Sequence, residues 1–290
     1  MDGVIIVDKP KDYTSRDVVN VISKIYHTKK VGHTGTLDPL ATGVLVVCLN
    51  KATKIVELLT CYDKEYVASF KFGVLTDTLD NTGSILNDEE CILNKEDLLN
   101  AMKQIEGTYM QEVPIYSAVR INGKKLYEYA REGLEVELPK HEVTISDLEL
   151  LSFNAEDNHT IVSIKCHVSK GTYIRSLGND IANILGTNAI MTELRRTKQG
   201  TFTIEDSIEL KNITEDTKLI SINDCLSMYK MIIAGFNLEE DILNGKILDN
   251  IYDEDNILFI DSNNNPIALY TIYDKEINKI KPWKMFKNRV

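Results

Sequence analysis

Short apolar runs separated by polar turns occupy the first 220 residues of the chain. The β-branched run at 4–7 ends just before Pro10 and predicts a strand. The apolar run at 44–49 predicts a fully buried strand. Residues 64–72 and 161–168 alternate apolar and polar side chains with a period of two, which predicts two strands with one buried face each.

Apolar side chains recur at helical spacing in three other segments. Helices are expected over 15–26, 94–107 and 176–185. Thr14 and Asp17 resemble a capping box at the start of the first helix, and Asn94 is a favourable N-cap for the second. Gly107 ends the second helix, and Gly186 ends the third. Single helices between strands, without a regular βαβ repeat, indicate an α+β fold with a mixed or mostly antiparallel central sheet and flanking helices.

Asn122 and Gly123 form a strong hairpin-turn signal in the middle of the chain. The residues that follow, 124–141, are highly charged with nearly balanced signs. We expect this charged segment to form a projecting arm.

The pattern of apolar and polar residues changes after about residue 220. Short alternating runs at 257–260 and 267–273, separated by a polar turn, predict small β-structure. We therefore expect a first domain over 1–225 and a small β-rich domain over 226–290.

Composition excludes several classes of protein. The chain has 290 residues, 43% hydrophobic and 27% charged, and no apolar run approaches the roughly 20 residues that cross a bilayer. The start of the chain does not resemble an export signal, so a cytoplasmic protein is expected. Five widely spaced cysteines without a C-x-x-C pair suit a reducing compartment and support neither a disulfide framework nor a metal site.

The charge of the chain is unevenly distributed. The net charge is −11, yet Lys and Arg outnumber Asp and Glu in residues 1–54 and 163–200. These segments also carry the most unusual motifs. Phosphate binding needs only a local positive potential, so the negative net charge does not exclude a polyanionic ligand. Random fluctuation of charge along the chain is the alternative.

The stretch 31–46, V-G-H-T-G-T-L-D-P-L-A-T-G-V-L-V, places one carboxylate, Asp38, in a loop bounded by glycines. Pro39 restricts Asp38 to an extended or turn conformation. The Asp38 carboxylate is therefore either a turn anchor or a catalytic group. His33, in the same stretch, is either a site residue or a hydrogen-bonded loop histidine.

Two distant residues could complete a site around Asp38. Arg175 lies where a strand gives way to a helix, and a guanidinium there could keep the carboxylate ionised and oriented, or could instead be exposed on the surface. Tyr66 falls on the apolar face of its predicted strand, where it is either a core tyrosine or a platform for a planar base. Leu194-Arg195-Arg196 could be a helix end with solvated arginines.

Taken together, these segments resemble the TruB-type tRNA pseudouridine synthases. The resemblance covers most of residues 1–210 in family order. The motifs that carry it are V-D-K-P at 7–10 with Thr14-Ser15, G-H-T-G-T-L-D-P-L-A-T-G at 32–43, K-E-Y at 64–66, G-V-L-T-D-T-L-D at 73–80, V-P-I-Y-S-A-V-R at 113–120, S-K-G-T-Y-I-R-S-L at 169–177 and L-R-R-T-K-Q-G at 194–200.

The resemblance implies an isomerase that converts one uridine in the T loop of tRNA, position 55, to pseudouridine without a cofactor. It implies that Asp38 is the catalytic aspartate, that Tyr66 stacks on the uracil and assists removal of the C5 proton, and that Arg175 pairs with Asp38. His33 would fill the space left by the flipped base. When a base is extruded, its neighbours lose their stacking contacts, and a side chain can replace them.

Further roles follow from the same resemblance. Tyr173 and Leu194 would line the uracil pocket, while Lys9 and Pro10 would support the active-site loop. Residues 116–142 would be an RNA-gripping insertion into a catalytic domain that spans 1–225. Residues 226–290 resemble a PUA-like RNA-binding domain, whose contact with the tRNA acceptor stem is inferred by analogy.

Two alternatives to a stand-alone isomerase stay open. The protein could act chiefly as an RNA-folding chaperone whose binding matters more than its chemistry. It could also be the relative that works in a protein complex with a guide RNA, although compact length and the lack of basic tails favour the stand-alone form that acts on tRNA. Nothing in the sequence calls for more than a monomer.

Overall fold

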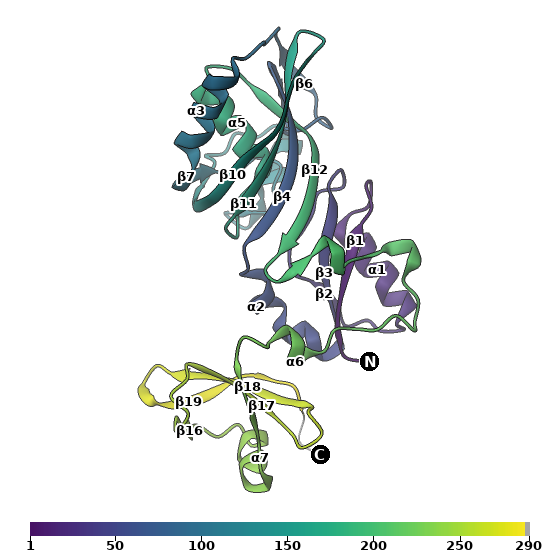
Figure 1. Ribbon diagram of the computed structural model, residues 1–290, viewed down its shortest axis with the longest axis vertical. Helices are drawn as coiled ribbons and strands as arrows, with labels where there is room; N and C mark the ends of the chain where they lie inside the picture. The colour runs from purple at the N-terminus through teal and green to yellow at the C-terminus, as the bar shows by residue number, and fades with distance from the viewer. Residues whose placement is uncertain (288–290) are drawn as a thin grey trace.

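A ten-stranded mixed sheet forms the larger part of the protein in a computed structural model that describes residues 1–287 (Figure 1). Its main path runs β14-β1-β3-β12-β4-β11-β10-β7, with β13 paired to β12 and β2 to β3. The strands are β1 (Gly3–Lys9), β2 (Val31–His33), β3 (Thr42–Leu49), β4 (Lys64–Phe72), β7 (Gly107–Glu112), β10 (Lys140–Glu156), β11 (His159–Val168), β12 (Ala189–Gln199), β13 (Phe202–Thr203) and β14 (Ile208–Glu209). Two neighbouring pairs, β1 with β14 and β12 with β3, are parallel and the others antiparallel. The expected α+β class with a mixed central sheet is confirmed.

Strand β4 lies inside this sheet, between β11 and β12. Every second side chain from Lys64 to Phe72 is buried, as the period of two predicts. It pairs antiparallel with β11 on one side and β12 on the other. Tyr66 is thereby fixed opposite Cys166 and Arg196.

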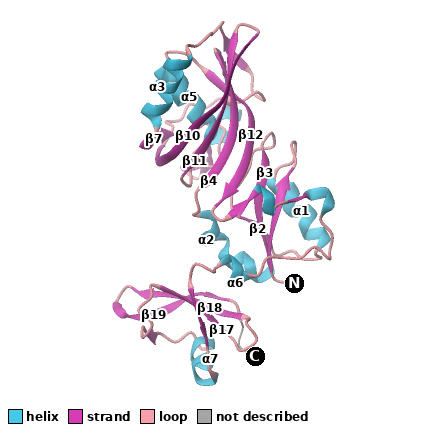
Figure 2. Ribbon diagram, in the orientation of Figure 1, coloured by secondary structure: helices cyan, strands magenta, loops and turns pink. Residues whose placement is uncertain are grey.

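The longer helices flank the sheet (Figure 2). They are α1 (Ser15–Ile25), α3 (Lys95–Ile105) and α5 (Ile174–Ile184), with short helical segments η1 (Asn50–Ile55), α2 (Val56–Thr60), η2 (Ile204–Asp206), η3 (Leu210–Asn212) and α6 (Ile222–Cys225). Helices α3 and α5 bury their apolar faces against β4, β10, β11 and β12 in one core cluster. Helix α1 packs on β1 and β3 in another. The predicted capping box of α1 is present, and Asn94 caps α3 as expected.

Several local expectations need correction. Residues 31–33 form strand β2, because Val31 to His33 pair with β3 instead of remaining a loop. Leu194-Arg195-Arg196 is not a helix end but part of β12, where the alternation places Arg196 inside the protein, 1% exposed. Helix α5 begins two residues earlier than predicted, so Arg175 lies in its first turn.

The charged arm contains more regular structure than its composition suggested. Strands β8 (Arg120–Ile121) and β9 (Lys124–Lys125) form the predicted hairpin, with Asn122 and Gly123 both at positive φ. Helix α4 (Leu126–Glu132) follows directly. A second small hairpin, β5 (Val74–Thr76) with β6 (Ile85–Asp88), precedes α3.

A separate five-stranded sheet forms the C-terminal part, in the order β15-β17-β18-β19-β16. Its elements are β15 (Lys230–Ile233), α7 (Phe236–Leu243), β16 (Leu248–Asp249), β17 (Asn256–Ile260), β18 (Pro266–Tyr273) and β19 (Glu276–Met285). The predicted strands at 257–260 and 267–273 are confirmed, whereas α7 was not anticipated. Within residues 1–287, no helix is both long and apolar enough to cross a membrane.

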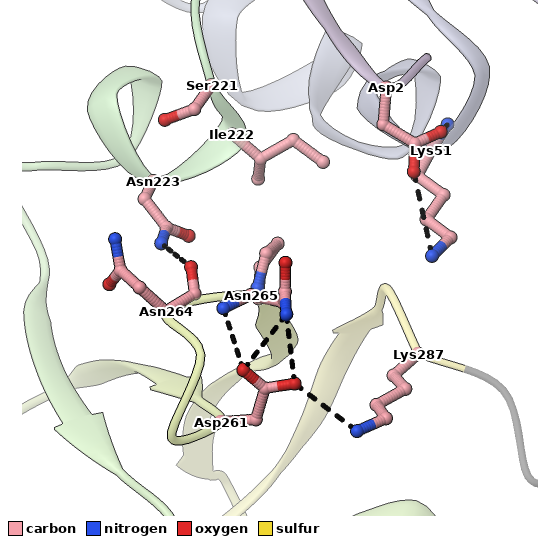
Figure 3. A pocket seen from close by; sticks show the side chains of 10 residues that line it. Asp2, Lys51, Ser221, Ile222, Asn223, Asp261, Asn264, Asn265 and Lys287 are labelled. Atoms are coloured by element: carbon pink, nitrogen blue, oxygen red, sulfur yellow. Dashed lines mark hydrogen bonds and ion pairs between the residues drawn. The ribbon is translucent and has the colours of Figure 1, made fainter.

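The two sheets meet in a shared apolar cluster. Leu258, Leu269 and Phe286 of the C-terminal sheet belong to the same buried cluster as Val44 and Val46 of β3. Beside this junction lies a polar pocket of about 450 Å³ (Figure 3). There the Asn223 amide donates to the carbonyl oxygen of Asn264 at 2.8 Å, and Lys287 pairs with Asp261 at 3.3 Å.

Candidate active site

A pocket of about 340 Å³ lies where the loop after β2 meets β4, β12 and the start of α5. Five residues predicted from the sequence line it. They are Asp38, Tyr66, Tyr173, Arg175 and Leu194. The remaining lining comes from Thr36, Leu37, Thr172 and Ile174 beside them and from Tyr116, Ser117, Ala118 and Tyr127 of the arm segment.

An ion pair joins Asp38 to Arg175. The Nε atom of Arg175 lies 3.2 Å from Oδ2 of Asp38. The Arg175 side chain is 8% exposed and that of Asp38 is 37% exposed, so the carboxylate remains open to the pocket while the guanidinium is covered. Arg175 is therefore a buried counter-ion, and its alternative interpretation as a surface residue is wrong.

The guanidinium of Arg175 is held by further partners. Its Nη1 donates to the carbonyl oxygen of Thr78 and its Nη2 to that of Tyr116, each at 3.0 Å. Asp80, 4% exposed, adds a second carboxylate 3.8 Å from Nη1. Because a planar guanidinium with several fixed acceptors has little freedom, Arg175 presents Nε to Asp38 in one orientation.

Buried polar side chains of β12 hold the backbone before and after Asp38. The Nε atom of Arg196 donates to the carbonyl oxygen of Val44 at 2.7 Å, and its Nη2 donates to that of Gly35 at 3.1 Å. Gln199 Nε2 donates to Oγ1 of Thr34 at 2.6 Å. These contacts give the buried Arg196 cation hydrogen-bond acceptors, as burial of a charge requires.

The other side of the loop is held by Lys9 and Ser15. Lys9 is fully buried, and its ammonium donates to the carbonyl oxygens of Pro10, Tyr13 and Pro39 at 2.9, 2.5 and 3.2 Å. Burial lowers the pKa of Lys9 to about 8. The Ser15 hydroxyl accepts from the amide of Leu37 at 2.8 Å. The backbone on both sides of Asp38 is thus fixed by buried side chains.

Glycine is required at the end of the loop for a steric reason. Gly43 has φ +101°, and a Cβ there would overlap the backbone carbonyl of Arg196 on the neighbouring strand. Close approach of β12 at this point therefore excludes larger residues. It is the same approach that brings Arg196 to the loop.

Tyr66 and Leu194 form the wall opposite the helix. Each is 8% exposed, and each belongs to the main core cluster while also lining the pocket. Tyr66 is thus a core residue that also lines the pocket, and its role as a platform for a planar base stays a prediction. Tyr173 lies at the N-cap position of α5, and burial raises the pKa of its hydroxyl.

His33 is a predicted RNA-binding residue that lies outside this pocket. It stands on β2 opposite Val47 and is not among the residues that line the pocket. Its Nδ1 accepts a hydrogen bond of 3.4 Å from the amide of Gly35, and burial lowers the pKa of its imidazole. His33 is thus hydrogen-bonded on a strand and not in a loop, and its expected place in the space left by the flipped base stays a prediction.

Sequence reasoning missed the aromatic residues of the arm and the buried residues that hold the loop. Tyr116 and Tyr127 line the pocket, and Arg196, Gln199 and Ser15 position the backbone near Asp38. Tyr116, Arg196 and Gln199 fall inside motifs that carry the family resemblance. Their presence in those motifs was the signal that could have identified these three residues.

The pocket combines one carboxylate with several aromatic walls. Asp38 is the sole carboxylate among its lining residues, which does not suit a pair of acids of the glycosidase type. Four tyrosines surround it, and aromatic faces stack on planar bases. Within residues 1–287 no group of three or more His, Cys, Asp or Glu side chains is arranged to hold a metal ion.

Comparison with known proteins gives two family matches. Residues 23–174 match the TruB family pseudouridylate synthase N-terminal domain, and residues 175–227 match the tRNA pseudouridylate synthase B C-terminal domain. The second match covers α5 and β12, which belong to the ten-stranded sheet, and it ends before the five-stranded sheet begins.

Curated relatives extend over the whole chain. A tRNA pseudouridine synthase B from Clostridium tetani is 46% identical over 80% of this chain and 80% of its own length. Another from Caldanaerobacter subterraneus is 42% identical over 99% of both chains. Among solved structures, a chain of an H/ACA RNP bound to a substrate RNA containing 2′-deoxyuridine is 25% identical, with a TM-score of 0.72, over 99% of this chain and 86% of that one.

Proposed function

The chain belongs to the TruB family of pseudouridylate synthases, and from this premise we propose that it converts the T-loop uridine of tRNA, position 55, to pseudouridine. The relatives named above are tRNA pseudouridine synthases by name, and one of them aligns over 99% of this chain. The reaction is an isomerisation of one nucleoside, which needs no redox cofactor.

Asp38 is the proposed catalytic group. A uridine inside a folded loop must leave its stack before an enzyme can reach its glycosidic bond. With the base in the pocket, the Asp38 carboxylate faces the ribose and promotes cleavage of the C1′–N1 bond. The freed uracil rotates and rejoins the ribose through C5, and the C5 proton leaves to N1 by way of solvent or a side chain.

Arg175 and Tyr66 assist this step in different ways. The Arg175 guanidinium lies 3.2 Å from the Asp38 carboxylate and orients it for the reaction. Tyr66 supplies the face on which the uracil stacks and lies near the C5 proton that must leave. Leu194 and Tyr173 complete the walls of the uracil pocket.

Contacts with the rest of the tRNA are proposed for two parts of the chain. The arm over 116–142 adjoins the pocket through Tyr116 and Tyr127 and carries Lys124, Lys125 and Arg131 over tyrosine rings. The C-terminal domain, 226–290, is proposed to be PUA-like and to contact the acceptor stem. Cations close to a phosphate backbone raise affinity in a salt-dependent way.

The single observation that carries the proposal is the pairing of Asp38 with Arg175 inside an aromatic-walled pocket. The test is to incubate the purified chain with unmodified tRNA and map each modified uridine. The wild-type chain is expected to modify position 55 alone, and Asp38→Asn is expected to produce no pseudouridine while still binding tRNA. Asp12→Asn is the matched control, because Asp12 is an exposed loop carboxylate at positive φ that asparagine tolerates.

The same assay separates this proposal from the other functions considered. Activity of the purified chain on tRNA alone contradicts a requirement for partner proteins and a guide RNA. Full turnover by Asp38→Asn contradicts the catalytic role of Asp38. Restoration of tRNA folding by the inactive Asp38→Asn chain would favour the chaperone function.

A further inference from the structure

Gln111 joins the edge strand β7 to the start of helix α5. It is 1% exposed and is the fully buried residue of a strand that otherwise faces solvent or is half-buried. Its Oε1 accepts a hydrogen bond of 2.7 Å from the amide of Tyr173, and its Nε2 donates to the hydroxyl of Tyr109 at 2.8 Å. Both polar ends of the buried amide are therefore used.

The contacts of Gln111 continue to the middle of the same helix. The Tyr109 hydroxyl donates to Oδ2 of Asp180 at 2.8 Å, and that oxygen lies 3.4 Å from Nε2 of Gln111. Burial raises the pKa of the Tyr109 hydroxyl and of the Asp180 carboxyl. These hydrogen bonds from β7 therefore hold α5 at two places along its length, Tyr173 and Asp180.

The first of these places is the residue that begins α5. Tyr173 is the N-cap residue, and its own side chain makes no cap hydrogen bond. Its amide is held by Gln111, and its carbonyl oxygen accepts from the amide of Leu177 at 3.0 Å. The backbone at Tyr173 is thus fixed from both sides by hydrogen bonds, of which only the Gln111 contact comes from outside the helix.

The position of Tyr173 determines where the site residues lie. Arg175 follows in the first turn of α5, and both residues line the pocket that contains Asp38. Because a helix is stiff, a shift of its first residue moves Arg175 with it. Displacement of a reacting group by about 1 Å costs about 100-fold in rate.

We propose that Gln111 is a positioning residue for pseudouridine synthesis. Through the Tyr173 amide it fixes the start of α5, and with it the direction from which Arg175 meets Asp38. This inference rests on the proposed function. A residue that served stability alone would change the population of folded protein and leave the rate of the folded enzyme unaltered.

The test compares three variants by the single-turnover rate and by the Kd for tRNA. Gln111→Met removes both polar atoms at similar volume. Gln104→Met is the matched control on the exposed side of α3. Ser176→Ala removes a different contact of α5 with β7, the 2.9 Å hydrogen bond from the Ser176 hydroxyl to the carbonyl oxygen of Glu112, without touching the Tyr173 amide.

Gln111→Met is expected to lower the single-turnover rate by about 10- to 100-fold while the Kd for tRNA changes by less than about twofold. Gln104→Met is expected to keep the wild-type rate, and Ser176→Ala, in which Gln111 still holds the Tyr173 amide, is expected to lose less than Gln111→Met. A wild-type rate for folded Gln111→Met overturns the inference, as does an equal loss in Ser176→Ala or a loss confined to Kd.

A fourth variant decides the question if Gln111→Met does not fold. Tyr109→Phe keeps the aromatic ring and removes the hydroxyl that orients Gln111. A fall in rate of about threefold or more at unchanged Kd supports the inference, and a wild-type rate overturns it. Wild-type and Asp38→Asn chains run in parallel, because failure of the proposed function would show as an inactive wild-type chain.

Discussion

The ammonium group of Lys9 donates a hydrogen bond of 3.2 Å to the carbonyl oxygen of Pro39, the residue that follows Asp38. The same group donates to the carbonyl oxygens of Pro10 and Tyr13. One buried cation therefore joins the end of β1 to the loop that carries the proposed catalytic carboxylate.

Replacement of Lys9 by methionine is expected to destabilise the protein and slow the reaction. The carbonyl oxygens of Pro10, Tyr13 and Pro39 would lose a donor inside the protein, at a cost of about 1–3 kcal/mol in the free energy of unfolding. Urea denaturation measures the loss, and Lys11→Met on the exposed neighbouring position is the control. Equal stability of the two variants would contradict the role assigned to Lys9.

The contribution of Lys9 to stability is expected to depend on pH. Burial lowers its pKa in the folded chain to about 8, whereas the ordinary value is 10.5. Between these values the unfolded chain binds more protons, so the contribution of Lys9 rises as pH increases from about 8 to 10.5. The upper limit is about 1.4 kcal/mol per pH unit.

The measurement is the difference in the free energy of unfolding between wild type and Lys9→Met at pH 7.5, 8.5 and 9.5. Other titrating groups largely cancel in this difference. The stability advantage of the wild-type chain should grow across the series. A difference that shrinks or stays constant would mean that Lys9 does not carry a lowered pKa.

Arg175→Lys is expected to lose activity although it keeps the positive charge. One ammonium group cannot replace three directed contacts, to Asp38, Thr78 and Tyr116. We expect kcat to fall by about 100-fold or more, because orientation of the Asp38 carboxylate is lost, with a smaller change in KM.

The control for this substitution is Arg16→Lys on the exposed surface of α1. Steady-state kinetics on unmodified tRNA gives both constants for each variant. If Arg175→Lys retained wild-type kcat, charge alone would be sufficient and the fixed geometry of the guanidinium would not matter.

Gly178→Ala is expected to destabilise the protein through overpacking. Gly178 lies on α5, and a Cβ there would overlap the ring of Phe70 on β4. Forcing the helix from the sheet costs about 1–3 kcal/mol. Gly235→Ala is the matched control, because a Cβ at Gly235 meets nothing within 4 Å and its φ is negative.

Thermal or urea unfolding of the two alanine variants checks this expectation. Gly235→Ala should unfold like the wild-type chain. Equal midpoints for Gly178→Ala and the wild type would show that α5 can move away from β4 at no cost, which would also weaken the argument for a fixed Arg175.

The sequence alone determined the elements whose signals are local. Strand β4 was predicted with its observed bounds because side-chain alternation depends only on neighbouring residues. The caps of α1 and α3 and the hairpin turn at Asn122-Gly123 were predicted for the same reason. The candidate site residues Asp38, Tyr66 and Arg175 came from motifs in family order, since residue-level reasoning left each with a structural alternative.

Tertiary structure decided which of those residues meet and what holds them. Asp38 and Arg175 lie far apart in the sequence, and only the return of α5 to the sheet brings them to 3.2 Å. Arg196 could not be recognised as buried until β12 was seen beside β3, and the place of His33 on a strand was not evident until β2 was seen to pair. A hydrogen bond such as that from the Tyr173 amide to Gln111 depends on where two distant segments meet, and no local pattern encodes that distance.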